Sequence, residues 1–83
     1  MTPRLTAPQM AVLRALDKLP EGVMVDATSG GFSAGAAANL AFPGIGETYL
    51  VAAEWKRSEG RYRYALSPAG RALIAKLKAE GQW

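Results

Sequence analysis

The chain has 83 residues, 49% of them hydrophobic and 20% charged, with a net charge of +3 and neither cysteine nor histidine. This length and balance predict one globular domain over residues 1–83, which buries roughly 60–65% of its unfolded surface. The missing residue types exclude disulfides, thiolate metal sites, imidazole general bases and the usual hydrolase triads.

The charge is distributed unevenly along the sequence. Residues 19–55 contain no lysine or arginine, while the remainder holds ten basic residues against three acidic ones, a net charge of +7. Four carboxylates give the middle stretch its charge of −4, and they are Glu21, Asp26, Glu47 and Glu54. The net charge of +3 and the basic isoelectric point of about 9.6 are compatible with an anionic partner, but the acidic middle stretch would repel one.

The sequence has no pattern typical of targeting or membrane insertion. Its apolar runs fall short of a membrane span, and its N-terminus has neither the basic start nor the long apolar core of a signal peptide. We therefore expect no membrane partner, and the absence of cysteine favours the cytoplasm of a bacterium or its virus.

The first predicted element is a helix over Ala7–Lys18. Thr6 is placed as its N-cap, and Gln9 three residues later completes a capping box. Pro20 and Gly22 end the element. The apolar residues that recur at helical spacing are Val12, Leu13, Leu16 and Leu19.

The middle of the sequence has weaker signals. Val23–Val25 is short and β-branched, which predicts a brief strand. Ser33 is placed to cap an Ala-rich helix that reaches Leu40 or Ala41, and the proline and glycines that follow end this helix. Whether residues 26–57 hold two helices, or one helix and a long loop, stays open.

A β-hairpin is predicted over residues 50–66. Arg61–Leu66 alternates in the manner of a half-buried strand. Glu47–Lys56 fits a strand and a helix almost equally well, but a strand over Leu50–Lys56 gives the second strand the partner that it needs. Gly60 suits the turn between the two strands.

The last predicted element is a helix that follows the second strand directly. Ser67 is placed as its N-cap and Pro68 as its first residue, so the helix covers Pro68–Ala79. Gly81 suits its C-terminal stop. The apolar stripe of this helix consists of Leu73, Ile74 and Leu77.

The segment Tyr-Ala-Leu-Ser-Pro-Ala-Gly-Arg-Ala-Leu, residues 64–73, resembles the junction between wing and last helix in winged-helix (winged helix-turn-helix) domains of small bacterial or phage transcriptional regulators. The order of the predicted elements is similar too. The resemblance implies a small α+β fold with about three helices and a two- to three-stranded antiparallel wing sheet. It also implies binding of double-stranded DNA, with a recognition helix in the major groove and the wing beside it. A homodimer would enlarge the small footprint of one such module.

The predicted hairpin carries four cations, namely Lys56, Arg57, Arg61 and Arg63. They concentrate positive charge on a narrow projection, as a wing does where it meets phosphates or enters a minor groove. An edge hairpin kept soluble by charge explains the same residues, so both interpretations stay open.

The region where a recognition helix should lie offers Ser33, Asn39 and Thr48 as side chains that could read bases. Its negative charge opposes DNA binding. The alternative is therefore a winged helix that binds protein rather than DNA, as a complex subunit or as a phage-type inhibitor of a host nucleoprotein machine. The acidic patch for such a partner would comprise Glu21, Asp26, Glu47 and Glu54.

The remaining patterns favour structural roles. Gly31–Gly35 matches the G-x-S-x-G pattern of a nucleophile elbow, but without a histidine it predicts a turn with Ser33 as helix cap. Tyr62, Tyr64 and Trp55 alternate onto one strand face, which predicts core packing rather than base stacking. We expect no enzymatic activity, no cofactor and no metal site.

Overall fold

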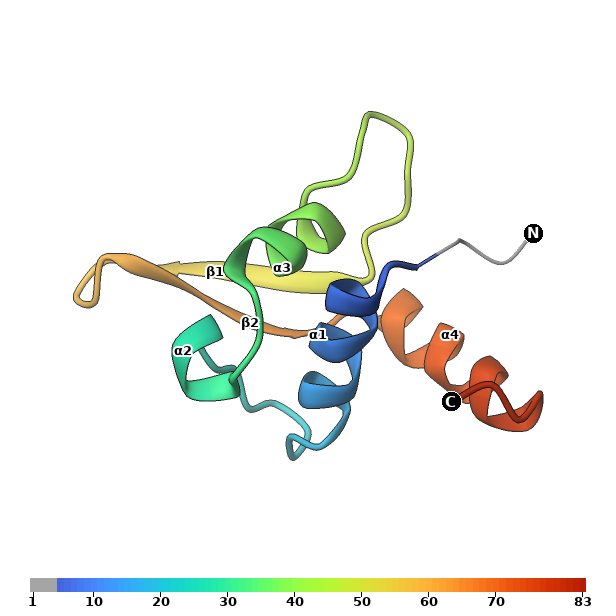
Figure 1. Ribbon diagram of the computed structural model, residues 1–83. Coiled ribbons are helices and arrows are strands. Elements are labelled where there is room, and N and C mark those ends of the chain that lie inside the picture. The colour runs from blue at the N-terminus through green and yellow to red at the C-terminus, as the bar shows by residue number, and fades with distance from the viewer. Residues whose placement is uncertain (1–4) are drawn as a thin grey trace.

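Helix α1 (Ala7–Asp17) is the first element of the computed structural model, which describes residues 5–83 (Figure 1). Its predicted capping box is present. The Gln9 backbone N–H donates to the Thr6 hydroxyl at 3.3 Å, and the Thr6 N–H donates to the Gln9 side-chain oxygen at 2.9 Å. The helix ends one residue earlier than predicted and buries Val12, Leu13 and Leu16.

Two helices occupy the middle of the chain, and the sequence had left this open. The first, α2 (Ala27–Gly30), is a single turn that begins at Asp26, whose carboxylate accepts the Ser29 N–H at 3.4 Å. Gly31 ends it in the left-handed conformation, with a φ of 72°. One turn is too short to produce a periodic apolar pattern, so the sequence gives no helical signal there.

The second of these helices, α3 (Ala34–Ala41), begins where the sequence predicts. The Ser33 hydroxyl accepts the Ala36 N–H at 3.3 Å and caps the helix. The buried side of α3 consists of Ala36, Ala37 and Leu40, and the helix packs against α1 and the hairpin. Because these residues are mostly small, α3 lies close to its neighbours.

Strands β1 (Val51–Lys56) and β2 (Arg61–Leu66) form the predicted antiparallel hairpin. The pairs on one face are Val51–Leu66, Ala53–Tyr64 and Trp55–Tyr62, and those on the other are Ala52–Ala65, Glu54–Arg63 and Lys56–Arg61. Figure 1 shows that the base of the hairpin lies among the helices, whereas its turn projects beyond α2 and α3. This projection gives the chain an end that no helix covers.

The strand predicted over Val23–Val25 is reduced to a single bridge, so that prediction is wrong in extent. The Val25 N–H donates to the Tyr64 carbonyl at 3.0 Å, and the Tyr64 N–H donates back at 2.7 Å. The reason is local, because a turn at Gly22 precedes the segment and the cap of α2 follows at once. One residue is all that remains to pair with β2.

Helix α4 (Pro68–Ala79) has the predicted bounds and the predicted cap. The Ser67 hydroxyl accepts the Gly70 N–H at 3.0 Å and donates to the Tyr49 carbonyl at 2.7 Å. Ser67 is almost fully buried, so both hydrogen bonds are shielded from water. The hydroxyl therefore fixes the start of α4 to the loop that leads into β1.

The core lies where α1, α3, α4 and the base of the hairpin meet. It contains Val12, Leu13, Leu16, Ala36, Ala37, Leu40, Val51, Tyr64, Leu66 and Ile74. Trp83 packs back against this core, and the guanidinium of Arg14 lies 5.5 Å from the centroid of its ring. Within residues 5–83, the helices are all too short or too polar to cross a lipid bilayer.

Candidate functional site

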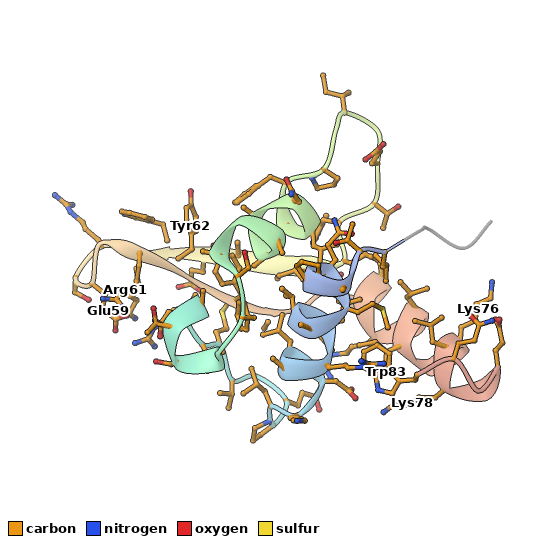
Figure 2. The ribbon with its side chains drawn as sticks, in the orientation of Figure 1. Glu59, Arg61, Tyr62, Lys76, Lys78 and Trp83 are labelled. Atoms are coloured by element: carbon orange, nitrogen blue, oxygen red, sulfur yellow. The ribbon has the colours of Figure 1, made fainter. Side chains whose placement is uncertain are left out.

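The projecting end of the hairpin carries the four cations that the sequence singled out. Two of them are held by carboxylates of the chain itself. Arg61 donates to Asp26 at 2.9 Å, and Arg63 forms an ion pair with Glu59, both on the side of the hairpin opposite Tyr62 (Figure 2). An anionic partner would have to compete with these carboxylates for the two guanidinium groups.

The other two cations, Lys56 and Arg57, enter no ion pair with the described residues 5–83. Lys56 ends β1 and is half-buried, and Arg57 begins the turn and is exposed. Their charges are therefore available to an anion without the loss of an internal ion pair. The four predicted cations thus fall into two pairs. Arg61 and Arg63 are bound to carboxylates, and we call Lys56 and Arg57 the available cations.

Asp26 joins the hairpin to the helical body. Its side chain is 13% exposed, caps α2, and binds Arg61 at a sequence separation of 35 residues. Hydrogen bonds from Ser29 and then from Arg61 lower the pKa of Asp26 from 3.8 to about 2. The carboxylate is thus stabilised in its charged form, and it orients the outer part of β2.

Changing Asp26 to asparagine is expected to flatten the pH dependence of thermal unfolding between pH 3.8 and about 2. A lowered folded-state pKa stabilises the fold above the unfolded value of 3.8, and this contribution is lost as the pH falls through about 2. Asparagine still caps a helix, so the change removes the charge and keeps the cap. Melting curves between those two pH values measure the effect. A variant as acid-sensitive there as the wild type would contradict it.

Three aromatic side chains form an exposed cluster at the same end of the hairpin as the available cations. We call Phe42, Trp55 and Tyr62 the aromatic ledge. The ring centroids of Phe42 and Tyr62 lie 5.6 Å apart with their planes at 64°, and those of Trp55 and Tyr62 lie 5.0 Å apart at 69°. The three residues are 57%, 52% and 38% exposed, respectively. They hold one another edge to face and leave much of their surface to solvent.

The prediction that Tyr62, Tyr64 and Trp55 all pack in the core is right for Tyr64 alone. Tyr64 is buried, and its ring meets that of Phe32 edge to face with 5.9 Å between centroids. Burial raises the pKa of the Tyr64 hydroxyl, with a smaller effect from Tyr62. Alternation assigns a residue to a strand face, but it does not tell how far along that face the helices extend.

The three polar residues predicted to read bases do not form one surface. Ser33 caps the start of α3, so its hydroxyl already accepts a backbone N–H. Asn39 lies near the other end of the helix, where it and Thr48 line a shallow pocket together with the carboxylate-bearing Glu47. Between these two ends, α3 exposes Ala34 and Gly35. The outward side of α3 thus has few projecting side chains and no cation.

The four carboxylates predicted as an acidic patch lie on four separate segments. Glu21 follows α1, Asp26 caps α2, Glu47 lies in the loop before β1, and Glu54 lies on β1. Asp26 and Glu54 are both near Arg63, and they add to the effect of Glu59 in raising the pKa of that guanidinium. Asp26 is bound to Arg61, and Glu54 lies opposite Arg63 in the sheet, so positive charge beside both carboxylates argues against a common acidic surface.

No metal-binding cluster of acidic side chains is present among residues 5–83. Within the G-x-S-x-G match, the Ser33 hydroxyl serves as the helix cap that the sequence predicts. The site that remains is the projecting end of the hairpin together with the aromatic ledge.

Sequence reasoning missed Phe42 as a member of the site. The residue follows the last residue of α3, and nothing in its local pattern indicates that its ring meets Tyr62. An aromatic residue just after an Ala-rich helix is the signal that could have raised the question.

Comparison with protein-family models, with curated proteins and with solved structures finds no match for this chain.

Proposed function

We propose that this chain is a winged-helix-type module that binds DNA through the end of the β1–β2 hairpin. The observation that carries the proposal is the pair Lys56 and Arg57, two cations that enter no ion pair within residues 5–83, at the tip of a hairpin that projects beyond α2 and α3. The order of elements supports it, with a hairpin between α3 and α4 and a bridge from Val25 to β2.

The expected binding is electrostatic and weak. Each phosphate that a cation neutralises contributes a slope of about −0.9 to the dependence of log affinity on log salt, so two contacts give about −2. Non-specific dissociation constants at physiological salt lie at roughly 10⁻⁴–10⁻⁶ M, and a dimer would strengthen them. Arg61 and Arg63 remain candidate contacts, but a phosphate would have to compete with Asp26 for the first and with Glu59 for the second. A regulatory role in the cytoplasm belongs to the same proposal.

Replacing Lys56 and Arg57 together by alanine is expected to weaken duplex binding at low salt and to reduce the salt slope by about 2. Fluorescence anisotropy with a labelled random duplex at several salt concentrations measures both quantities. The matched control removes Arg71 and Lys76, two exposed cations of α4, the helix that lies on the side of the molecule away from the hairpin turn (Figure 1). If the two double variants lose affinity equally, the hairpin has no special role.

A protein-binding module is the second candidate, and α3 favours it. Its outward side has no cation and exposes Ala34 and Gly35, so a partner's backbone could approach closely, and the aromatic ledge lies beside it. Trp and Tyr are the residues that most often dominate protein interfaces. On this interpretation, no nucleic acid binds even at low salt.

A further inference from the structure

The aromatic ledge and the available cations occupy the same end of the hairpin. Trp55 and Tyr62 form the last cross-strand pair on their face before the turn, and Lys56 and Arg57 follow immediately in the chain. We infer that the ledge stacks on unpaired bases, so that the protein binds single-stranded nucleic acid in preference to duplex. The inference rests on the proposed function, because it needs the hairpin cations to hold the phosphates.

The geometry of the rings suits stacking. In an edge-to-face pair, the ring that offers its edge keeps both of its own faces clear of its partner. Half of the surface of Trp55 and more than half of that of Phe42 are exposed. Stacking of a base on such a ring is tolerant of sequence and strengthens binding roughly fivefold to a hundredfold per base.

The distribution of charge favours nucleic acid over protein as the occupant. The hairpin carries two carboxylates, and both are turned away from the ledge, since Glu54 pairs across the strands with Arg63 and Glu59 binds the same arginine. Figure 2 shows Tyr62 on one side of the hairpin, with Glu59 and Arg61 on the other. The ledge is thus an aromatic surface without hairpin carboxylates. Two cations that enter no ion pair within residues 5–83 flank this end of the hairpin, Arg57 two positions after Trp55 and Lys56 on the opposite face with Arg61. That is the combination found in sites for single strands.

The neighbouring surface of α3 is compatible with a passing strand. Ala34 is exposed and small and lines a pocket with Tyr62, and Gly35 follows it on α3, so neither presents a bulky side chain to a polymer that crosses beside Tyr62. A duplex meets the same surface differently, because each of its bases is covered on both faces by its neighbours. The ledge could then contact only a duplex end, so the duplex retains the phosphate contacts and loses the stacking.

The test follows the fluorescence of Trp55. The chain has two tryptophans, so Trp83→Phe makes Trp55 the only one while keeping a ring beside Arg14. Titration of this protein with a short oligothymidine at low salt is expected to quench its emission. An abasic oligomer of equal length, which retains the phosphates and lacks the bases, is expected to bind at least about fivefold more weakly.

Substitution of the ledge separates stacking from charge. Trp55→Ala and Phe42→Ala are each expected to weaken oligothymidine binding about fivefold or more and to change duplex binding by less than about twofold. Tyr49→Ala is the matched control, because Tyr49 is 51% exposed and lies outside the ledge. Circular dichroism verifies that each variant is folded.

The outcomes distinguish the two proposals. If the oligothymidine and its abasic counterpart bind equally, or the ledge variants bind like the Tyr49 control, stacking is overturned while the role of the hairpin cations stands. If neither single strand nor duplex binds at low salt, both proposals fail.

Discussion

Replacing Gly70 by alanine is expected to lower the free energy of unfolding by about 3 kcal/mol, at the upper end of the range for overpacking. A Cβ atom at this position would lie 2.1 Å from the carbonyl oxygen of Leu50 and 3.1 Å from its carbonyl carbon. These are backbone atoms that cannot rotate away. The same oxygen accepts the Ser67 N–H at 3.2 Å, so a shift of Leu50 breaks a hydrogen bond as well.

The clash would also separate α4 from the start of β1. Ser67 connects the two through its hydroxyl, which binds both the Gly70 N–H and the Tyr49 carbonyl. Moving α4 outward by enough to admit a methyl group stretches these hydrogen bonds together. The Leu66 side chain, 3.4 Å from the added atom, limits movement in another direction. Relief is therefore available only by disturbing the junction.

Urea unfolding of Gly70→Ala beside Gly35→Ala provides the measurement. Gly35 lies in α3, and a Cβ atom there would have the Ser33 hydroxyl as its nearest neighbour at 3.7 Å, an ordinary contact. Alanine is the better helix former, so Gly35→Ala is expected to stabilise the protein by up to about 1 kcal/mol. If the two variants have equal unfolding midpoints, α4 does not pack closely against the Leu50 carbonyl, and the prediction is wrong.

The local signals in the sequence predicted most of the elements. Thr6, Ser33 and Ser67 cap the helices that their neighbours predicted, and the bounds of β2 and α4 agree with the alternation and the Ser-Pro start. These features depend on residues within four positions of one another, so the sequence displays them directly. The α+β class follows from them.

The features that the sequence did not predict depend on tertiary distance. In the sequence, Gly70 is only a glycine that weakens a helix. The structure shows why a glycine is needed there, because a side chain would collide with the carbonyl of Leu50. The cations of the hairpin were predictable, but the ion pair between Arg61 and Asp26 joins residues 35 positions apart. The exposure of Trp55 depends on where the helices end along the hairpin. No local pattern contains that information.

Replacing Tyr64 by alanine is expected to cost about 3–5 kcal/mol, the usual range for truncating a buried aromatic residue. Tyr64 is 5% exposed, contacts Phe32, and exchanges two backbone hydrogen bonds with Val25. Its ring therefore packs the segment after α2 against β2, while its backbone holds the segment before α2. A domain of this length has a total stability of roughly 4–12 kcal/mol, so the variant is expected to be partly unfolded at room temperature. Tyr64→Phe, which keeps the ring, is expected to stay within about 1 kcal/mol of the wild type.

Tyr62→Ala is the matched comparison, since it truncates the same residue type on the same strand face two positions away. Tyr62 is 38% exposed and contacts the other two rings of the ledge, so its loss is expected to cost about 1 kcal/mol. Thermal and urea unfolding of both variants measure the difference. Equal losses would show that the helices cover the whole face of the hairpin, and the ledge would then be part of the core. A large loss at Tyr64 with a small one at Tyr62 leaves the ledge as a surface that can be altered without unfolding the protein, which its binding tests require.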